Sequence, residues 1–218
     1  VEQYPDKPFL GYRKLDHATG RPAKEFTFKN WAEMGTVCQE LGSGILNLNL
    51  APEISEFRDY KMRFIALYAG NCPEWIHTDH AANCYGFTTI PMFDEMAWDS
   101  TIYIFRRTNV QTVFTTKRHL KEIVEMLKSG EDAFKCIKNI VILKGQEVFD
   151  LGDDTPNYKE NLSYLKSETK LSVYLWDEVL DAGRKNLQPF ADITSKHVFT
   201  LIYTSGTTGE PKAAMIES

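Results

Sequence analysis

The chain has 218 residues, of which 43% are hydrophobic and 25% are charged, so it is long enough for a globular fold with a substantial core. Its formal net charge of −5 at pH 7 argues against a nucleic-acid-binding surface, and we expect no nucleic-acid partner. The four cysteines lack the Cys-x-x-Cys spacing of zinc and redox sites, which fits a reduced intracellular compartment.

No apolar run approaches the ~18 residues that a membrane-spanning helix needs. The chain starts at Val1 without an initiator methionine and ends shortly after its most distinctive motif. We therefore expect a fragment of a larger protein, in which any membrane contact is made by segments outside residues 1–218. The histidines are expected to be surface or packing residues rather than metal ligands, including His77 and His80 on one predicted helix face.

Short apolar runs alternate with amphipathic stretches, the pattern of βαβ units around a parallel sheet. The expected strands cover residues 26–28, 64–68, 88–93, 110–115, 137–143 and 198–203. The expected helices cover residues 30–48, 71–85, 101–107, 117–128 and 176–182. Residues 145–171 are polar and acidic with weak periodicity, which indicates a long surface loop. Residues 213–217 fit a helix or a strand equally well.

The first long helix is predicted from apolar residues that recur every three or four positions, namely Trp31, Met34, Cys38, Leu41 and Ile45. The second has its own start and stop signals. Asn71 is placed to cap it, Pro73 suits its first turn, and Gly86 suits its end.

The most distinctive stretch combines hydroxyl residues, glycines and a lysine directly behind the apolar strand 198–203. Glycines let the backbone take positive φ and approach a ligand closely, and successive N–H groups can then bind an anion. Hydroxyls add hydrogen-bond donors, and a lysine adds a positive charge on a flexible stem. This combination predicts a polyphosphate-binding loop made of Thr204, Ser205, Gly206, Thr207, Thr208, Gly209 and Lys212.

Two other interpretations of this stretch are weaker. A polar surface turn uses the same residue types, but turns rarely combine four hydroxyls with a lysine. A Walker A loop places its lysine directly after a glycine and follows it with Ser or Thr. Here Glu210 and Pro211 stand between the glycine and the lysine, and Ala213 follows, so the loop is not of the Walker A kind.

Residues 203–212 resemble the signature of the adenylate-forming superfamily, Tyr-Thr-Ser-Gly-Thr-Thr-Gly-x-Pro-Lys-Gly, which follows a strand in those proteins. The match is continuous from Tyr203 to Lys212 and is highly specific. The chain departs from the signature at Ala213, where the family has glycine, and at residues 217–218, where the family has Thr-His. The extra methyl group at Ala213 bears on catalytic efficiency more than on membership.

Two upstream segments resemble the long-chain fatty acyl-CoA synthetases of that superfamily, which the chain resembles most closely. Residues 71–76 are similar to their Asn-x-Pro-Glu-Trp element, and residues 81–94 match the order and spacing of the segment that follows it. The resemblance covers roughly residues 25–218. We interpret residues 71–75 as a helix start with an aromatic side chain packed below it. Asp94 is expected to be structural, and a role in ligand binding at the end of its strand is the weaker alternative.

The resemblance implies an α/β fold in which parallel-sheet layers are covered by helices, as the first part of a large N-terminal domain. Residues 1–195 would form the first α/β portion of this AMP-binding domain. Residues 196–218 would contribute its strand and phosphate-binding loop.

The resemblance also implies an ATP-dependent long-chain fatty acid–CoA ligase, which forms an acyl-adenylate and then acyl-CoA, releasing pyrophosphate and AMP. Its small-molecule ligands would be ATP with Mg²⁺, a fatty acid and coenzyme A, and Lys212 would neutralise phosphate charge. The endoplasmic reticulum or peroxisome membrane would be its location, and residues 1–218 alone would be inactive. Two alternatives stay open: a ligase for another carboxylic acid, and a non-catalytic interaction module that keeps a relic loop.

Overall fold

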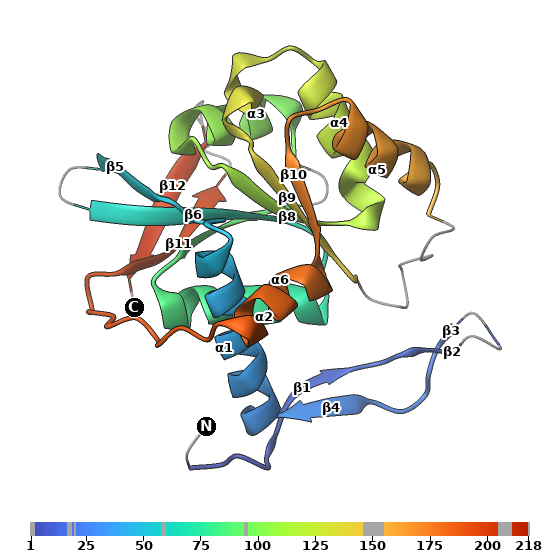
Figure 1. Cartoon of the computed structure of the whole chain (residues 1–218), viewed down its shortest axis with the longest axis vertical. Helices are drawn as coiled ribbons and strands as arrows, with labels where there is room; N and C mark the ends of the chain where they lie inside the picture. The colour runs from blue at the N-terminus through green and yellow to red at the C-terminus, as the bar shows by residue number, and fades with distance from the viewer. Residues whose placement is uncertain are drawn as a thin grey trace.

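The structure is a computed structural model, and it describes residues 3–16, 19, 21–57, 60–93, 96–145, 155–204 and 211–217. Within these residues an eight-stranded sheet lies between two layers of helices, and a smaller hairpin projects to one side (Figure 1). The mostly parallel sheet flanked by helices confirms the expected α/β fold class.

Every strand and helix expected from the sequence is present, with ends that shift by a few residues. The strands are β1 (Pro8–Tyr12), β2 (Leu15–Asp16), β3 (Arg21–Pro22), β4 (Thr27–Asn30), β5 (Glu53–Phe57), β6 (Tyr60–Tyr68), β7 (Thr88–Met92), β8 (Thr112–Thr116), β9 (Asn139–Leu143), β10 (Ser172–Leu175), β11 (Val198–Thr204) and β12 (Lys212–Glu217). The α-helices are α1 (Trp31–Asn47), α2 (Pro73–Tyr85), α3 (Trp98–Thr108), α4 (Leu120–Lys128), α5 (Tyr158–Ser167) and α6 (Trp176–Lys185). Two 3₁₀ turns are η1 (Lys117–His119) and η2 (Asp132–Cys136).

The strand order in the large sheet is β10-β9-β8-β6-β7-β11-β12, with β5 paired to β6. Strands β6 to β11 pair in parallel, while β12 is antiparallel to β11 and β5 is antiparallel to β6. The chain passes from the central β6 to β7 and then back to β8 on the other side of β6. Such a reversal of strand order marks the switch point of a doubly wound sheet.

The two faces of the sheet are covered by different helices. Phe64, Ala66 and Tyr68 of β6 pack in the cluster that includes α3, α4 and α5. Ile65 and Leu67 of the same strand pack in the cluster that includes α1, α2 and α6. Burial of one such Leu, Ile or Phe side chain contributes about 1.5–3 kcal/mol, so both helix layers are held on the sheet mainly by these alternating contacts.

Local sequence signals explain where the first two long helices begin and end. Asn30 and Glu33 form a reciprocal capping box at the start of α1, with N···O distances of 2.8 and 2.7 Å. At α2 the predicted cap at Asn71 is wrong by one residue, because Cys72 occupies the cap position in an extended conformation without a side-chain bond. Gly86 ends the helix with φ of 70°, as its freedom from a Cβ predicts.

The prediction of a long loop over residues 145–171 is wrong where α5 forms. This helix is polar over most of its surface and buries only Tyr158, Asn161 and Leu165, too few to create a clear sequence period. The following β10, which pairs with β9, was also not expected because it is short and no residue in it is fully buried. Residues 213–217, which fitted either structure, lie in strand β12.

Candidate functional site

The predicted phosphate loop follows β11, and this strand is fixed firmly in the sheet. Thr200 is in parallel register with Thr89 of β7, and its hydroxyl donates to the Thr89 carbonyl at 3.2 Å. At the start of the two strands, the hydroxyl of Thr88 on β7 donates to the carbonyl of Val198 on β11 at 2.6 Å. The strand is largely buried up to Tyr203 and becomes exposed at Thr204, the first residue of the predicted loop.

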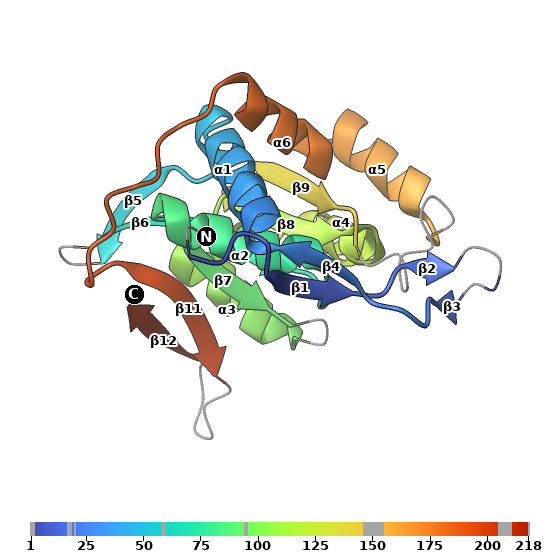
Figure 2. The ribbon, with the colours of Figure 1, turned by 90° about the horizontal axis from the view of Figure 1, so that it is seen from below.

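Strand β12 returns antiparallel beside β11, and the two form a hairpin at one end of the sheet (Figure 2). Thr204 pairs in register with Lys212, and its hydroxyl lies 3.5 Å from the Lys212 carbonyl oxygen. Both residues are exposed. The remaining predicted loop residues, Ser205, Gly206, Thr207, Thr208 and Gly209, lie outside the described residues, as does Asp94.

Thr204 and Lys212 lie at the carboxyl edge of the parallel strands. Strands β6 to β11 all run the same way, so their final residues share that edge, and β12 starts there because it runs in the opposite direction. Ligands of open α/β sheets bind outside this edge. The structure therefore brings together the two described members of the predicted phosphate site at the end of the sheet where a ligand is expected.

A second group on the same edge was missed by the sequence analysis. Tyr68 ends β6 and Thr116 ends β8, the two strands that flank the switch point. The Thr116 hydroxyl lies 2.8 Å from Nδ1 of the buried His119, and the rings of His119 and Tyr68 are 4.9 Å apart. These residues come from strands that meet only in the fold, so no local pattern in the sequence could have linked them.

A pocket of about 410 Å³ opens beside the hairpin, between β11, β12 and α3. Tyr203 lines it and meets Tyr103 of α3 edge to face, with ring centroids 6.4 Å apart. Burial, followed by the neighbouring Tyr103, raises the pKa of Tyr203 to about 12. The pocket also carries Arg107 and Lys212, which gives a mostly apolar cavity two cationic side chains.

The start of α2 adds buried titratable groups near this edge. Burial raises the pKa of the Glu74 carboxyl and lowers the pKa of His77 to about 4, so both groups favour their neutral forms. Cys72 is a free thiol whose pKa burial raises to about 12, which makes it a poor nucleophile. Of the two expected roles for His77, surface or packing, its burial shows packing. Trp75 is partly buried against the core, in agreement with the aromatic side chain predicted to pack below the helix start.

No group of three or more His, Cys, Asp or Glu side chains is arranged to hold a metal ion among the described residues. No helix within the same ranges is long and apolar enough to cross a membrane.

The profile of the family described as AMP-binding enzyme matches residues 1–218. The chain belongs to this family. This is the family that the Tyr203–Lys212 motif predicted, so the predicted family membership is confirmed.

Curated relatives of this chain include two long chain acyl-CoA synthetases of Arabidopsis thaliana. Long chain acyl-CoA synthetase 4 is 28% identical over 219 residues, and the peroxisomal long chain acyl-CoA synthetase 7 is 27% identical over 218 residues. The alignments cover 100% and 99% of this chain but 29% and 27% of the relatives. The chain thus spans less than a third of the length of these relatives. Their names support membership of a ligase family, although their sequence identity to this chain is low.

Solved structures with the same fold include the A domain of carboxylic acid reductase from Segniliparus rugosus, in complex with AMP and a co-purified carboxylic acid. Its TM-score to this chain is 0.72 at 22% identity, over 97% of this chain and 33% of the reductase chain. At this identity the likeness establishes the fold, which is that of an adenylation domain.

Proposed function

We propose that the complete protein is an ATP-dependent long-chain fatty acid–CoA ligase. The observation that carries the proposal is the β11–β12 hairpin, in which the paired Thr204 and Lys212 flank a Ser-, Thr- and Gly-rich segment at the carboxyl edge of the sheet. Family membership and the long-chain acyl-CoA synthetases among the relatives support the same reaction class.

The reaction needs a phosphate site because a carboxylate is a poor electrophile. In the first step a carboxylate oxygen attacks the α-phosphorus of ATP, and the bond to the bridging oxygen breaks, so that pyrophosphate leaves with the electron pair. AMP is then the leaving group when the thiol of coenzyme A attacks the acyl carbon and the thiol proton is lost. Two anions meet in the first step, so positioned positive charge and N–H donors must stabilise the transition state.

Lys212 is suited to this task in its position and its exposure. Its side chain is exposed and makes no ion pair with any other described residue, so its ammonium group is available to a phosphate. We assign it the role of neutralising charge on the β- and γ-phosphates. The rest of the phosphate site consists of Thr204, Ser205, Gly206, Thr207, Thr208 and Gly209, through their hydroxyls and main-chain N–H groups.

Mg²⁺ fits this scheme as part of the substrate MgATP. Mg²⁺ keeps most of its waters and is commonly held by substrate phosphates with only one or two carboxylates. The proposal also covers domain organisation and location. Residues 1–195 and 196–218 would belong to one N-terminal AMP-binding domain. A peroxisomal location is supported by the name of one relative.

The test is ATP–pyrophosphate exchange driven by fatty acids, measured on the intact protein. Lys212→Ala should slow exchange about 30- to 1000-fold, the equivalent of about 2–4 kcal/mol of transition-state stabilisation, because a charge-neutralising donor is lost. Lys196→Ala, an exposed lysine before β11, is the matched control and should leave exchange unchanged. Unchanged exchange in Lys212→Ala would contradict the assigned role.

The substrate series in the same assay separates the alternatives. Exchange driven by aryl or amino acids but not by fatty acids would identify a ligase for another carboxylic acid, the second candidate. The carboxylic acid reductase neighbour shows that this fold is not restricted to the long-chain synthetases. No exchange with any acid, in a folded protein, would favour a non-catalytic module.

A further inference from the structure

The β11–β12 hairpin has extensive pairing within itself but little main-chain pairing to the rest of the sheet. Six residue pairs link β11 to β12, the last of them Thr204 with Lys212. In the described part of the chain, β11 joins β7 at a single pair in register, Thr200 with Thr89, whereas five pairs join β7 to β6. The hairpin is therefore a unit whose main-chain attachment to the parallel sheet lies in the first half of β11.

Three buried threonine hydroxyls supply further bonds at this attachment. The hydroxyl of Thr88 donates to the carbonyl of Val198 at 2.6 Å, and that of Thr200 donates to the carbonyl of Thr89 at 3.2 Å. The hydroxyl of Thr89 lies 3.3 Å from the carbonyl oxygen of Phe199. Thr88 and Thr89 are 0% exposed and Thr200 is 5% exposed, so the surroundings of these hydroxyls do not depend on what covers the surface.

The hydroxyls hold β11 from both faces of the sheet. Neighbouring residues on a strand point to opposite faces, and Thr88 shares its face with Ile90, which packs in the cluster that includes α3, α4 and α5. Thr89 lies on the other face, where its hydroxyl is also 3.2 Å from Oδ1 of Asp79 on α2. Thr200, in register with Thr89, shares this second face. The strand cannot tilt toward either helix layer without breaking a buried hydrogen bond.

The sequence of β7 explains why its main-chain pairing to β11 ends early. Alternate residues of a central strand direct their N–H groups to opposite neighbours, so the donor that follows Thr89 on the β11 side is residue 91. This residue is Pro91, which has no N–H and cannot bond to β11. Pairing with β6 continues past it, to Tyr68 with Met92. The second half of β11 is therefore oriented by the first half, where the three hydroxyls lie.

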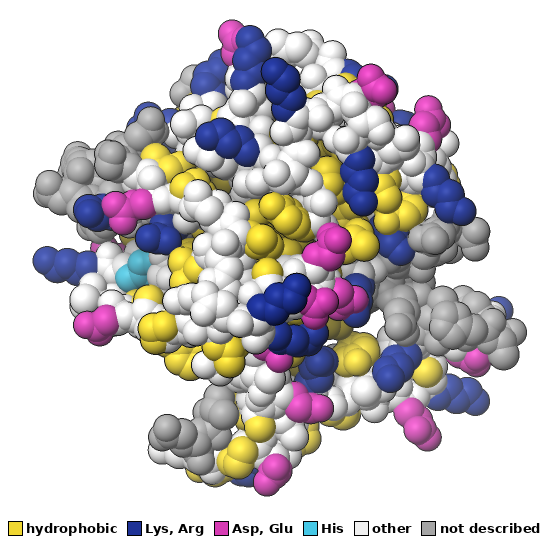
Figure 3. Space-filling model, in the orientation of Figure 1, with side chains coloured by type: hydrophobic (Ala, Val, Ile, Leu, Met, Phe, Trp, Pro, Cys, Tyr) yellow, Lys and Arg dark blue, Asp and Glu magenta, His cyan; other side chains and the backbone are white. Residues whose placement is uncertain are grey.

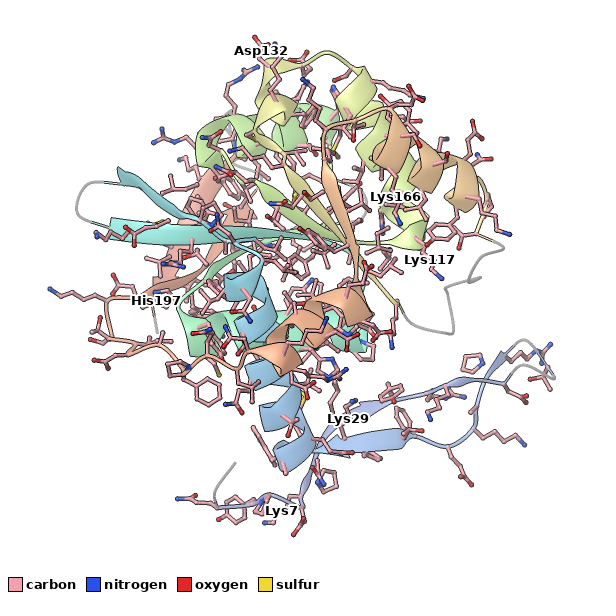
Figure 4. The ribbon with its side chains drawn as sticks, viewed as in Figure 1. Lys7, Lys29, Lys117, Asp132, Lys166 and His197 are labelled. Carbon is pink, nitrogen blue, oxygen red and sulfur yellow. The ribbon has the colours of Figure 1, made fainter. Side chains whose placement is uncertain are left out.

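The geometry of the strand turns a small tilt into a large displacement at the phosphate site. Figure 4 labels His197, directly before β11, at the opposite end of the sheet from Lys117, which follows β8 at the carboxyl edge. β11 thus crosses the sheet from its anchored start to its carboxyl end. At about 3.3 Å per residue, Thr204 lies about 13 Å beyond Thr200, so a tilt of about 5° moves Thr204 and its partner Lys212 by about 1 Å.

We propose that the hydroxyls of Thr88, Thr89 and Thr200 position the β11–β12 hairpin and thereby place Lys212 at the phosphates of ATP. Positive charge alone does not distinguish this lysine, because the chain has 25 lysines and arginines, and Figure 3 shows such side chains spread over the face in view. Its place distinguishes it, and misplacement by about 1 Å can slow a reaction about 100-fold. The inference rests on the proposed function of Lys212 and adds the positioning residues that act through it.

The test compares Thr200→Val with Thr200→Ser in ATP–pyrophosphate exchange by the intact protein. Valine keeps the branched shape without the hydroxyl, so exchange should slow about tenfold or more, whereas serine keeps the hydroxyl and should restore most of the rate. Thr88→Val should slow exchange in the same way from the other face. The matched control is Thr112→Val on β8, which removes another buried hydroxyl, one that donates to the carbonyl of Leu50, and should leave exchange unchanged.

A double variant separates positioning from a general loss of stability. If Thr200 acts through Lys212, Thr200→Val should slow exchange much less in a protein that already carries Lys212→Ala. A general loss of stability would slow exchange equally in both backgrounds. Such equal slowing, unchanged exchange in Thr200→Val, or a similar loss in Thr112→Val would overturn the inference.

Hydrogen–deuterium exchange of the intact protein without ligands tests the attachment apart from the reaction. In Thr200→Val and Thr88→Val the amides of β11 and β12 should exchange faster, whereas those of β6 should keep their rates. An unaltered protein that shows no ATP–pyrophosphate exchange with any acid would contradict the proposed reaction. Unchanged amide exchange in both variants would overturn the positioning role itself.

Discussion

His77 is a buried histidine without a described hydrogen-bond partner for either ring nitrogen. Its ring stacks on Trp176 of α6 with a centroid distance of 6.2 Å, so it fills space between two helices. Burial, and then the electrostatic effect of Lys29 and of the neighbouring His80, lower its pKa to about 4. In the folded protein His77 therefore stays neutral at pH values where an unfolded histidine is charged.

This shift predicts a stability loss in mild acid. Between pH 6.5 and 4 the unfolded chain binds a proton at His77 that the folded chain does not, so the free energy of unfolding falls as the pH is lowered. From pH 7 to pH 5 the contribution is about 2 kcal/mol. Glu74, whose pKa burial raises, acts in the opposite sense, because its folded form takes up a proton more readily. Urea unfolding at both pH values measures the sum.

The variant His77→Phe isolates the histidine, since it keeps an aromatic ring against Trp176 but cannot titrate. The drop in unfolding free energy from pH 7 to pH 5 should be smaller in the variant by about 2 kcal/mol. An equal drop in both proteins would show that His77 is charged in the folded state or does not titrate in this range.

Tyr85 joins three elements through its hydroxyl. It lies 3.0 Å from Oγ of Ser43 on α1 and donates to the carbonyl of Gln188, 2.8 Å away, in the segment after α6. Tyr85→Phe should lower the free energy of unfolding by about 1–3 kcal/mol, because buried polar groups lose a partner. Tyr12→Phe, at a partly exposed position on β1, is the control and should change stability much less. Equal effects in urea unfolding would argue that the hydroxyl of Tyr85 is not structural.

At the scale of elements, the sequence is most informative where one face of an element is continuously buried. α1 was predicted from Cys38, Leu41 and Ile45, which are all buried, whereas α5 was missed because few of its residues reach the core. The phosphate loop is likewise predicted from a local pattern, and its two described members, Thr204 and Lys212, are paired in the β11–β12 hairpin. The Tyr68–His119 contact was not predictable, because it depends on the pairing of β6 with β8.

The packing of α6 on α1 depends on two glycines that allow the backbones to touch. A Cβ at Gly183 would lie 1.7 Å from the carbonyl oxygen of Glu40, and a Cβ at Gly44 would lie 2.0 Å from that of Val179. Because the obstructing atoms belong to backbone, no side-chain rotation relieves the clash. The two helices are thus held closer than any other residue at these positions would permit.

Gly183→Ala should therefore destabilise the protein by about 3 kcal/mol, at the upper end of overpacking effects. At an unobstructed helical position the same change would stabilise by about 1 kcal/mol, so the sign of the effect is diagnostic. Lys185→Ala, an exposed position on the same helix, serves as the control. A stabilised Gly183→Ala variant in urea unfolding would mean that α6 is not packed this closely on α1.

At the scale of the whole molecule, helices cover both faces of the large sheet, whereas the outer strand β12 is exposed. Helices shield both faces, but β12 pairs within the described chain only with β11, and all six of its residues are exposed. Met215 and Ile216 expose 45% and 37% of their surfaces. An exposed apolar edge strand offers free N–H and C=O groups to a strand of another molecule, which promotes aggregation.

For residues 1–218 expressed by themselves, Met215→Lys/Ile216→Lys should raise severalfold the concentration at which light scattering detects aggregates. The lysines place charge on the outer strand, and association by strand pairing would bring those charges together. Leu187→Lys/Phe190→Lys adds the same charge at similarly exposed positions that lie outside any strand, so net charge alone is controlled. If both variants raised the concentration equally, solubility would depend on total charge and the edge of β12 would have no special part in it. A larger effect at β12 would identify this strand as the surface that the intact protein has to cover.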